Sequence, residues 1–171
     1  MRRWLWWGAL LVLGLGVVAL WWAWPREEPT LVYFVHWDEK CNTGRLAPGL
    51  RVARGRTPTE RLAYALRSLL EGPNPEEQGM GYSSEIPSGT RLLGVRVERG
   101  VAYVNLSREF ERGGGSASML ARVYQIVYTA TRMRGVDAVQ ILLEGRLQET
   151  LGGEGLFIGT PLRRPPSAPE F

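Results

Sequence analysis

Residues 90–107, TRLLGVRVERGVAYVNLS, contain two runs rich in β-branched and other apolar residues, with a short turn between them. Residues 90–97 and 101–107 are predicted strands of a hairpin, and Gly100 can adopt the positive φ that its tight turn needs. Side chains alternate across a strand, so half of the second run should face the core. Ala102, Val104 and Leu106 are expected to face one side, and Val101, Tyr103 and Asn105 the other. Asn105 is polar in an otherwise apolar strand and is expected to hold a loop by hydrogen bonds.

Two amphipathic helices are predicted, one on each side of this hairpin in the chain. Residues 57–71, TPTERLAYALRSLLE, open with a capping-box pattern at Thr57 and Glu60, with Pro58 in the first turn. The second helix is predicted over about 116–133, with an apolar stripe on one side. The polar residues opposite that stripe are expected to form an exposed face that could contact a partner: Arg122, Gln125, Thr129 and Arg132.

The remaining segments complete an α+β pattern. Further strands are predicted at 31–37, 50–54, 137–145 and 156–159. DAVQILLEG (137–145) is apolar almost throughout, which is typical of a central strand. Residues 38–49 and 73–89 are predicted loops, and the second of these is a further candidate contact surface. Because each helix has one apolar face to bury, the expected fold is a single compact domain: one mixed β-sheet with both helices on the same face.

A transmembrane helix is predicted before this domain. Residues 4–24, WLWWGALLVLGLGVVALWWAW, carry no charge, and as a helix they span about 31 Å, close to the hydrocarbon thickness of a bilayer. Tryptophans mark both ends, and Arg2 and Arg3 precede the segment, which predicts a cytoplasmic N-terminus, a single pass through the cytoplasmic membrane and an extracytoplasmic domain. The alternative is a cleaved signal peptide, although the bulky Trp-Trp-Ala-Trp-Pro exit differs from a small-x-small cleavage site.

These features divide the chain. Residues 1–3 are predicted as a cytoplasmic stub, 25–30 as a linker, 31–163 as the domain and 164–171 as a disordered tail. Beyond the apolar segment the net charge is about +2, which gives no case for a nucleic-acid partner. The single cysteine, Cys41, cannot form an internal disulfide.

The glycine-rich stretch ERGGGSASML (111–120) raises the question of catalysis. A phosphate-binding P-loop would need a lysine, and a nucleophile elbow would need a second glycine after Ser116. The favoured interpretation is a helix entry capped by Ser116, with an anion-binding nest or a catalytic serine as alternatives. No catalytic, cofactor-binding or metal-binding residue is therefore predicted. An aromatic patch of His36, Trp37 and Tyr82 could stack on a sugar, although such side chains more often complete a core edge.

Several segments, taken in order, resemble one domain family. They are LLEGP (69–73), IPSGTRLLGVRVERGVAYVNLS (86–107), QIVYT (125–129) and GVDAVQILLEG (135–145). Together they resemble the GerMN domain, the sporulation and germination module of bacterial envelope proteins, over about residues 30–163. One copy is expected here, with a tryptophan-flanked helix instead of a lipid-modified cysteine and without a fused β-propeller.

The resemblance implies a function as well as a fold. It implies an extracytoplasmic α+β domain that is tethered to the membrane, has no established catalytic residues and takes part in envelope assemblies. The expected function is therefore a non-catalytic interaction or scaffold domain that binds an envelope protein or self-associates. The alternative is a peptidoglycan- or glycan-binding module that uses Trp37 and Tyr82.

Overall fold

The computed structural model describes residues 26–38, 43–152, 155–167 and 169–171. Its elements are β1 (Arg26–Asp38), β2 (Thr43–Gly55), α2 (Pro58–Glu71), α3 (Pro75–Gly79), β3 (Tyr82–Ser83), β4 (Leu92–Glu98), β5 (Val101–Leu106), the 3-10 helix η1 (Arg108–Glu111), α4 (Ser116–Ala130), β6 (Ala138–Leu143), β7 (Arg146–Leu147), β8 (Thr150–Leu151), β9 (Leu156–Phe157) and β10 (Leu162–Arg163). The predicted transmembrane segment 4–24 lies outside the described residues. Within them, no helix combines the length and the apolar character needed to cross a membrane.

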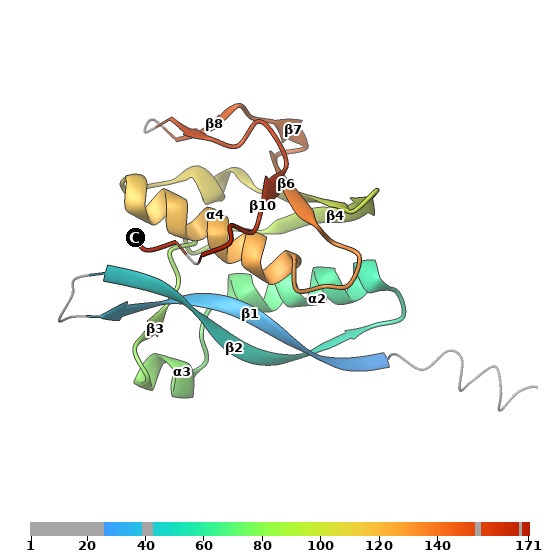
Figure 1. Cartoon of the computed structure of the whole chain (residues 1–171), viewed down its shortest axis with the longest axis horizontal. Coiled ribbons are helices and arrows are strands. Elements are labelled where there is room, and N and C mark those ends of the chain that lie inside the picture. Colours follow the sequence, from blue (N-terminus) through green and yellow to red (C-terminus); the bar gives the residue numbers. More distant parts are fainter. Residues whose placement is uncertain (1–25, 39–42, 153–154, 168) are drawn as a thin grey trace, which may run out of the picture.

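The strands form two main sheets with the long helices between them, and β8 and β9 pair as a small third sheet (Figure 1). One sheet has the order β2-β1-β3, and the other has the order β10-β6-β5-β4, with β7 paired to β6. Helix α2 packs against β1, β2, β4 and α4, and α4 packs against β1 and β6. The α+β class and the mixed sheet are confirmed, because β5 and β6 run parallel while their neighbours run antiparallel. The expectation of one sheet with both helices on one face is wrong.

The burial of α4 explains this difference. Ten of its residues are buried, including polar ones, so nearly its whole circumference needs a covering layer. A single sheet face covers only one side of a helix, whereas two sheets cover opposite sides. One hydrophobic core therefore draws on both sheets and both helices, for example through Phe34, Leu66, Val104 and Ile126.

The β4–β5 hairpin matches its prediction. Residues Ala102, Val104 and Leu106 are completely buried, and Gly100 has a φ of 81°. Strand β6 lies between β5 and β10, so its predicted central position is also confirmed. Helix α2 begins with the expected capping box. The predicted cap of α4 is wrong, because Gly115 is the N-cap residue and Ser116 is the first helical residue.

The β1–β2 ribbon is longer than the sequence indicates. Each strand has 13 residues paired in continuous register, and these strands take up residues 26–30 of the predicted linker and residues 43–49 of the predicted loop. Pro48 pairs with Tyr33, whose backbone N–H and C=O bond to α4 and so point away from β2. This is a non-hydrogen-bonded pair, so the missing N–H of Pro48 costs the ribbon no bond. Long-range pairing with β1 thus overrides a turn-like local composition.

Two other predicted irregular segments are ordered. Residues 73–89 hold α3 and β3, and β3 pairs with β1. The tail 164–171 was expected to be disordered, but Phe171 exchanges two backbone hydrogen bonds of 3.1 Å with Gly44. Arg164 also donates to the carbonyl of Tyr128 at 2.7 Å. The described part of the tail therefore lies along the domain.

Candidate functional site

The glycine-rich segment is organised around one buried arginine. The Arg122 side chain is only 2% exposed, and its terminal nitrogens donate to the carbonyls of Phe110, Arg112 and Gly113 at 2.9–3.0 Å. They also donate to Ser118 Oγ at 2.9 Å. Burial lowers the pKa of Arg122, and the Glu85 carboxylate opposes that effect. The guanidinium holds the loop that leads into α4, so the prediction that Arg122 is exposed is wrong.

This arrangement explains why glycines precede α4. A Cβ on Gly114, which has a φ of 80°, would lie 2.5 Å from an Arg122 nitrogen and 2.6 Å from Ser118 Oγ. Glycine is therefore needed for the close approach of the loop to Arg122. Ser118 in turn donates to the Glu85 carboxylate at 2.6 Å. The segment is a structural helix entry.

Two more of the predicted surface residues on α4 are buried and cover the edge of β1. Gln125 Nε2 donates to the Tyr33 carbonyl at 3.1 Å, and Thr129 Oγ1 accepts from the Tyr33 N–H at 3.0 Å. Both side chains are fully buried, so their predicted exposure is also wrong. They take the place of a neighbouring strand, because they satisfy backbone groups that would otherwise remain free at a sheet edge. Of the four residues only Arg132 is exposed, where it lines a hollow beside Leu31 and Leu50.

The predicted aromatic patch is divided between two faces. His36 pairs with Tyr82 across β1 and β3, and their rings meet edge to face at 5.8 Å. Trp37 is the next residue on β1, so its side chain points to the opposite face, where it is 38% exposed beside Gly44. The structure therefore brings Tyr82 to His36 and does not bring Trp37 to Tyr82.

One hollow lies between η1 and the turn that joins β6 to β7. It has a volume of about 400 Å³ and is lined by Arg108, Glu111, Leu143, Glu144, Arg146 and Gln148, which we call the turn hollow. Within the described residues, its four charged side chains form no ion pair. Two positive and two negative side chains without ion-pair partners among the described residues surround one hollow. Such a hollow can bind a partner that itself carries positive and negative groups.

The turn beside this hollow has a rigid backbone. Glu144 and Gly145 both have positive φ, at 49° and 77°, which is the conformation of a type I′ hairpin turn. Asn105 Oδ1 accepts from the Gly145 N–H at 2.7 Å, and a Glu144 carboxylate oxygen accepts from the Arg108 N–H at 2.9 Å. The expectation that Asn105 holds a loop is confirmed. Sequence reasoning missed the hollow itself, and the only signal was the Glu-Gly dipeptide after the apolar run.

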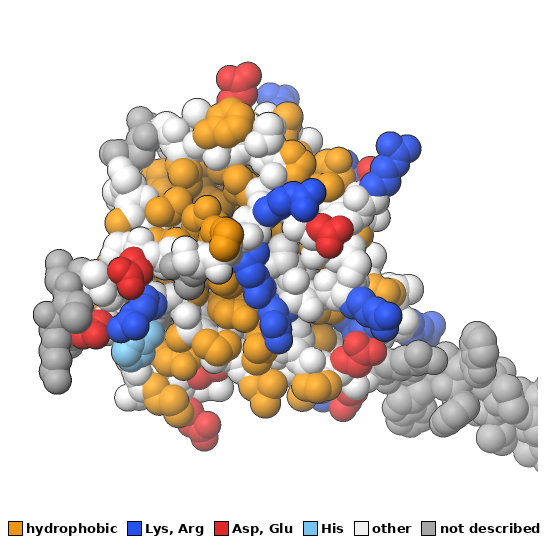
Figure 2. Space-filling view, in the orientation of Figure 1, with side chains coloured by type: hydrophobic (Ala, Val, Ile, Leu, Met, Phe, Trp, Pro, Cys, Tyr) orange, Lys and Arg blue, Asp and Glu red, His pale blue; other side chains and the backbone are white. Residues whose placement is uncertain are grey.

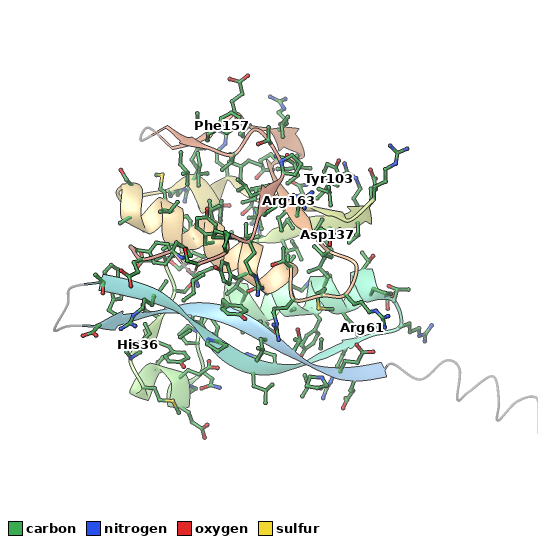
Figure 3. All side chains as sticks on the ribbon, viewed as in Figure 1. His36, Arg61, Tyr103, Asp137, Phe157 and Arg163 are labelled. Carbon is green, nitrogen blue, oxygen red and sulfur yellow. The ribbon has the colours of Figure 1, made fainter. Side chains whose placement is uncertain are left out.

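A second hollow lies on the outer face of the β4–β5–β6 sheet, on the other side of Gly145. It has a volume of about 280 Å³, and its lining includes Arg96, Tyr103, Asn105 and Leu142. The Arg96 guanidinium lies 4.1 Å from the centre of the Tyr103 ring. Gly94 leaves room here, because a Cβ added to it would meet no atom within 4 Å. We call this the Tyr103 hollow, and Figure 3 shows Tyr103 in the sheet remote from His36.

Among the residues that the structure describes, no three His, Cys, Asp or Glu side chains gather where they could hold a metal ion.

Comparison with known proteins identifies a family and solved structures that are similar to this chain. A family model described as sporulation and spore germination, Germane, matches residues 31–149. No curated protein matches the chain. The tandem GerMN domains of the sporulation protein GerM from Bacillus subtilis have a TM-score of 0.66 at 17% identity, covering 81% of this chain and 46% of theirs.

Two single-domain structures are also similar. The first GerMN domain of the same Bacillus subtilis protein has a TM-score of 0.56 at 19% identity, covering 79% of this chain and 98% of its own. A candidate lipoprotein from Clostridium perfringens has a TM-score of 0.57 at 20% identity, covering 81% of this chain and 88% of its own. At these identities the likeness shows a shared fold. With the family match over residues 31–149, it shows that the chain belongs to the GerMN (Germane) family of sporulation and spore germination domains.

Proposed function

We propose that this protein is a membrane-anchored extracytoplasmic interaction domain of a bacterial envelope assembly and that it has no catalytic activity. The tryptophan-flanked apolar segment 4–24 supplies the anchor, and the GerMN domain that follows supplies the contact surface. The sporulation protein and the candidate lipoprotein of the same fold are consistent with an envelope location.

The turn hollow is the observation that carries this proposal. Its four charged side chains lie beside a hydrogen-bonded turn, and the described residues leave them without ion-pair partners. A surface that is charged, concave and rigid loses little conformational entropy on binding and selects a partner by charge complementarity. The buried polar groups on α4 have structural roles instead, which argues against an acid–base or nucleophilic site there.

Site-specific crosslinking in intact membranes tests the partner role. A photoreactive residue at Gln148, in the turn hollow, should give a discrete adduct with an envelope protein or with a second copy of the chain. The same residue at Arg67, exposed on α2, should not. The double variant Arg108→Glu/Arg146→Glu should abolish the Gln148 adduct, whereas Arg67→Glu/Arg134→Glu should leave it. Equal adducts from both positions would contradict a specific surface.

The anchor has an independent test. Carbonate-washed membranes should retain the full-length protein, and a carboxyl-terminal reporter should be active only outside the cytoplasm. A soluble product that lacks residues 1–25 would instead indicate a cleaved signal peptide.

The Tyr103 hollow favours glycan binding as a second candidate function. It combines an aromatic ring, an amide and open space over Gly94, and aromatic rings with nearby amides are a common way to hold a sugar. Purified peptidoglycan should then pellet the protein, and Tyr103→Ala should release it while Tyr82→Ala should not. Protein that stays in the supernatant would exclude this function.

A further inference from the structure

The outer face of the β1–β2 ribbon has an unusual composition. Five successive cross-strand pairs on this face are apolar or glycine: Pro29–Val52, Leu31–Leu50, Tyr33–Pro48, Val35–Leu46 and Trp37–Gly44. Paired residues of a ribbon point to the same side, so these side chains form one continuous strip. The opposite face carries Val32 and Phe34 into the core. The ribbon thus carries apolar side chains on both faces, and on the outer face the Tyr33 ring meets that of Tyr128 on α4, with ring centres 5.4 Å apart.

The carboxyl-terminal tail covers only part of the strip. Arg164 lies 5.5 Å from the centre of the Tyr33 ring, and Phe171 pairs with Gly44. The other end of the strip stays open, with Leu50 66% and Val52 46% exposed. We call this open end, which comprises Pro29, Leu31, Leu50 and Val52, the ribbon patch. Hydrophobic side chains reach the surface of the ribbon in the lower part of Figure 2.

The ribbon patch lies beside the start of β1, immediately after the apolar segment. Only four residues separate Trp24 from Pro29, so Pro29 lies within ~18 Å of the end of that segment even if the chain between is fully extended. The polar headgroup layer adds only about 5–8 Å to each side of the hydrocarbon core. If residues 4–24 span a bilayer, the tether therefore keeps the start of the ribbon patch within about 10–13 Å of the membrane surface.

The charges around the patch suit an anionic surface. Two acidic side chains near the start of β1 are paired, Glu27 with Arg54 at 3.0 Å and Glu28 with Arg61 at 3.3 Å. Arg132 lines a hollow of about 190 Å³ with Leu31 and Leu50, and it has no ion-pair partner within the described residues. Apolar side chains next to a free guanidinium can insert among acyl chains while the cation binds a lipid phosphate.

We propose that the ribbon patch docks on the headgroup region of an anionic bilayer, so that the domain lies against the membrane. This inference rests on the proposed anchor. Leu50 and Val52 enter the interface, and Arg132 contacts lipid phosphates. The turn hollow belongs to the other sheet and stays available for a partner.

A fluorescence experiment on the full chain in liposomes tests this docking. An environment-sensitive dye is attached at Leu50→Cys in a Cys41→Ser background, and a matched control carries it at Leu93→Cys, which is 44% exposed on β4 in the other sheet. In phosphatidylglycerol vesicles the dye at position 50 should emit at shorter wavelength than the dye at 93. Nitroxide-labelled lipids should quench it several-fold more. Phosphatidylcholine vesicles or Arg132→Gln should reduce both differences.

Each other outcome overturns the docking proposal. Equal, water-like emission at positions 50 and 93 in protein that floats with the vesicles rejects docking and leaves the anchor intact. A blue shift at position 50 without lipid quenching indicates that protein covers the patch, as in a second copy of the chain. Protein that fails to float with the vesicles rejects the anchor and, with it, the docking.

Discussion

At the scale of single residues, three of the four polar side chains of α4 that were predicted to contact a partner instead form hydrogen bonds inside the domain: Arg122, Gln125 and Thr129. Arg122 shows the limit of periodicity as a guide, because it lies opposite the apolar stripe of α4 and yet is buried by the loop that it binds. Sequence can assign a residue to a helix face. It cannot tell whether a distant segment covers that face, since this depends on the whole fold.

Substitution of Arg122 should be among the most damaging single changes. Arg122→Met keeps much of the volume but leaves three backbone carbonyls and Ser118 without their donor. Each unsatisfied buried group costs about 1–3 kcal/mol, so the free energy of unfolding should fall by about 3 kcal/mol. Urea denaturation measures this loss. Arg132→Met on the exposed side should change it by less than about 0.5 kcal/mol, and a similar loss in both variants would contradict the structural role.

The Glu77–Arg51 pair should make stability depend on pH. The Arg51 guanidinium donates two hydrogen bonds of 2.7 Å to the Glu77 carboxylate and lowers the pKa of Glu77 below its ordinary value of about 4.5. A carboxylate whose pKa is lower in the folded than in the unfolded protein stabilises the fold. This stabilisation is complete at pH values above the unfolded-state pKa and is lost as the pH falls through the folded-state pKa.

Glu77→Gln should therefore cost about 2 kcal/mol at neutral pH and much less at acid pH. The measurement is urea denaturation of both proteins at pH 7 and again well below pH 4.5. Glu76→Gln is the control, because Glu76 is exposed on the same helix. A difference between Glu77→Gln and the parent protein that stays constant with pH would show that the ion pair does not titrate as described.

At the scale of elements, local patterns predicted α2, the β4–β5 hairpin and β6, because each has its own periodicity and end signals. The long β1–β2 ribbon was not predicted. Residues 43–49, TGRLAPG, have the composition of a turn, and only pairing with β1 extends them into a strand. The division into two main sheets could not be predicted from the sequence either, because it depends on how much of the surface of α4 must be buried. The turn hollow was missed for a related reason, since its lining comes from both sides of α4 in the sequence.

The contact between α4 and the edge of β1 can be tested by hydrogen exchange. Thr129→Val preserves shape but removes the oxygen that accepts from the Tyr33 N–H. The Tyr33 amide should then exchange faster. The Phe34 amide points to β2 by strand alternation and should change much less. Exchange measured by nuclear magnetic resonance separates the two amides. Equal acceleration of both would indicate general destabilisation of the ribbon.

At the scale of the whole molecule, the two surfaces proposed for binding belong to different layers. The ribbon patch lies on the β1–β2 sheet, whereas the turn hollow lies at the end of the β5–β6 sheet, with α2 and α4 between them (Figure 1). A domain built in this way can rest on a membrane with one layer and hold a partner with the other.

The carboxyl-terminal tail connects these layers, and its contribution can be measured. It leaves β10 in one sheet, stacks Arg164 on Tyr128 of α4 and on Tyr33 of β1, and ends paired with Gly44 of β2. Cation–π stacking contributes about 0.5–2 kcal/mol and a hydrogen bond about 1 kcal/mol. Arg164→Ala should therefore lower the free energy of unfolding by about 2 kcal/mol, and the exposed neighbour Arg163 is the matched control.

Deletion of residues 164–171 separates an ordered strap from a disordered tail. The hydrophobic core contains none of the described tail residues, so the shortened protein should still fold, with a denaturant slope close to that of the full chain and a lower midpoint. Its free energy of unfolding should fall at least as far as in Arg164→Ala, because the Phe171–Gly44 bonds are lost as well. A disordered tail would add nothing to stability. An unchanged midpoint after the deletion would therefore indicate that the tail is disordered, as the sequence alone predicts.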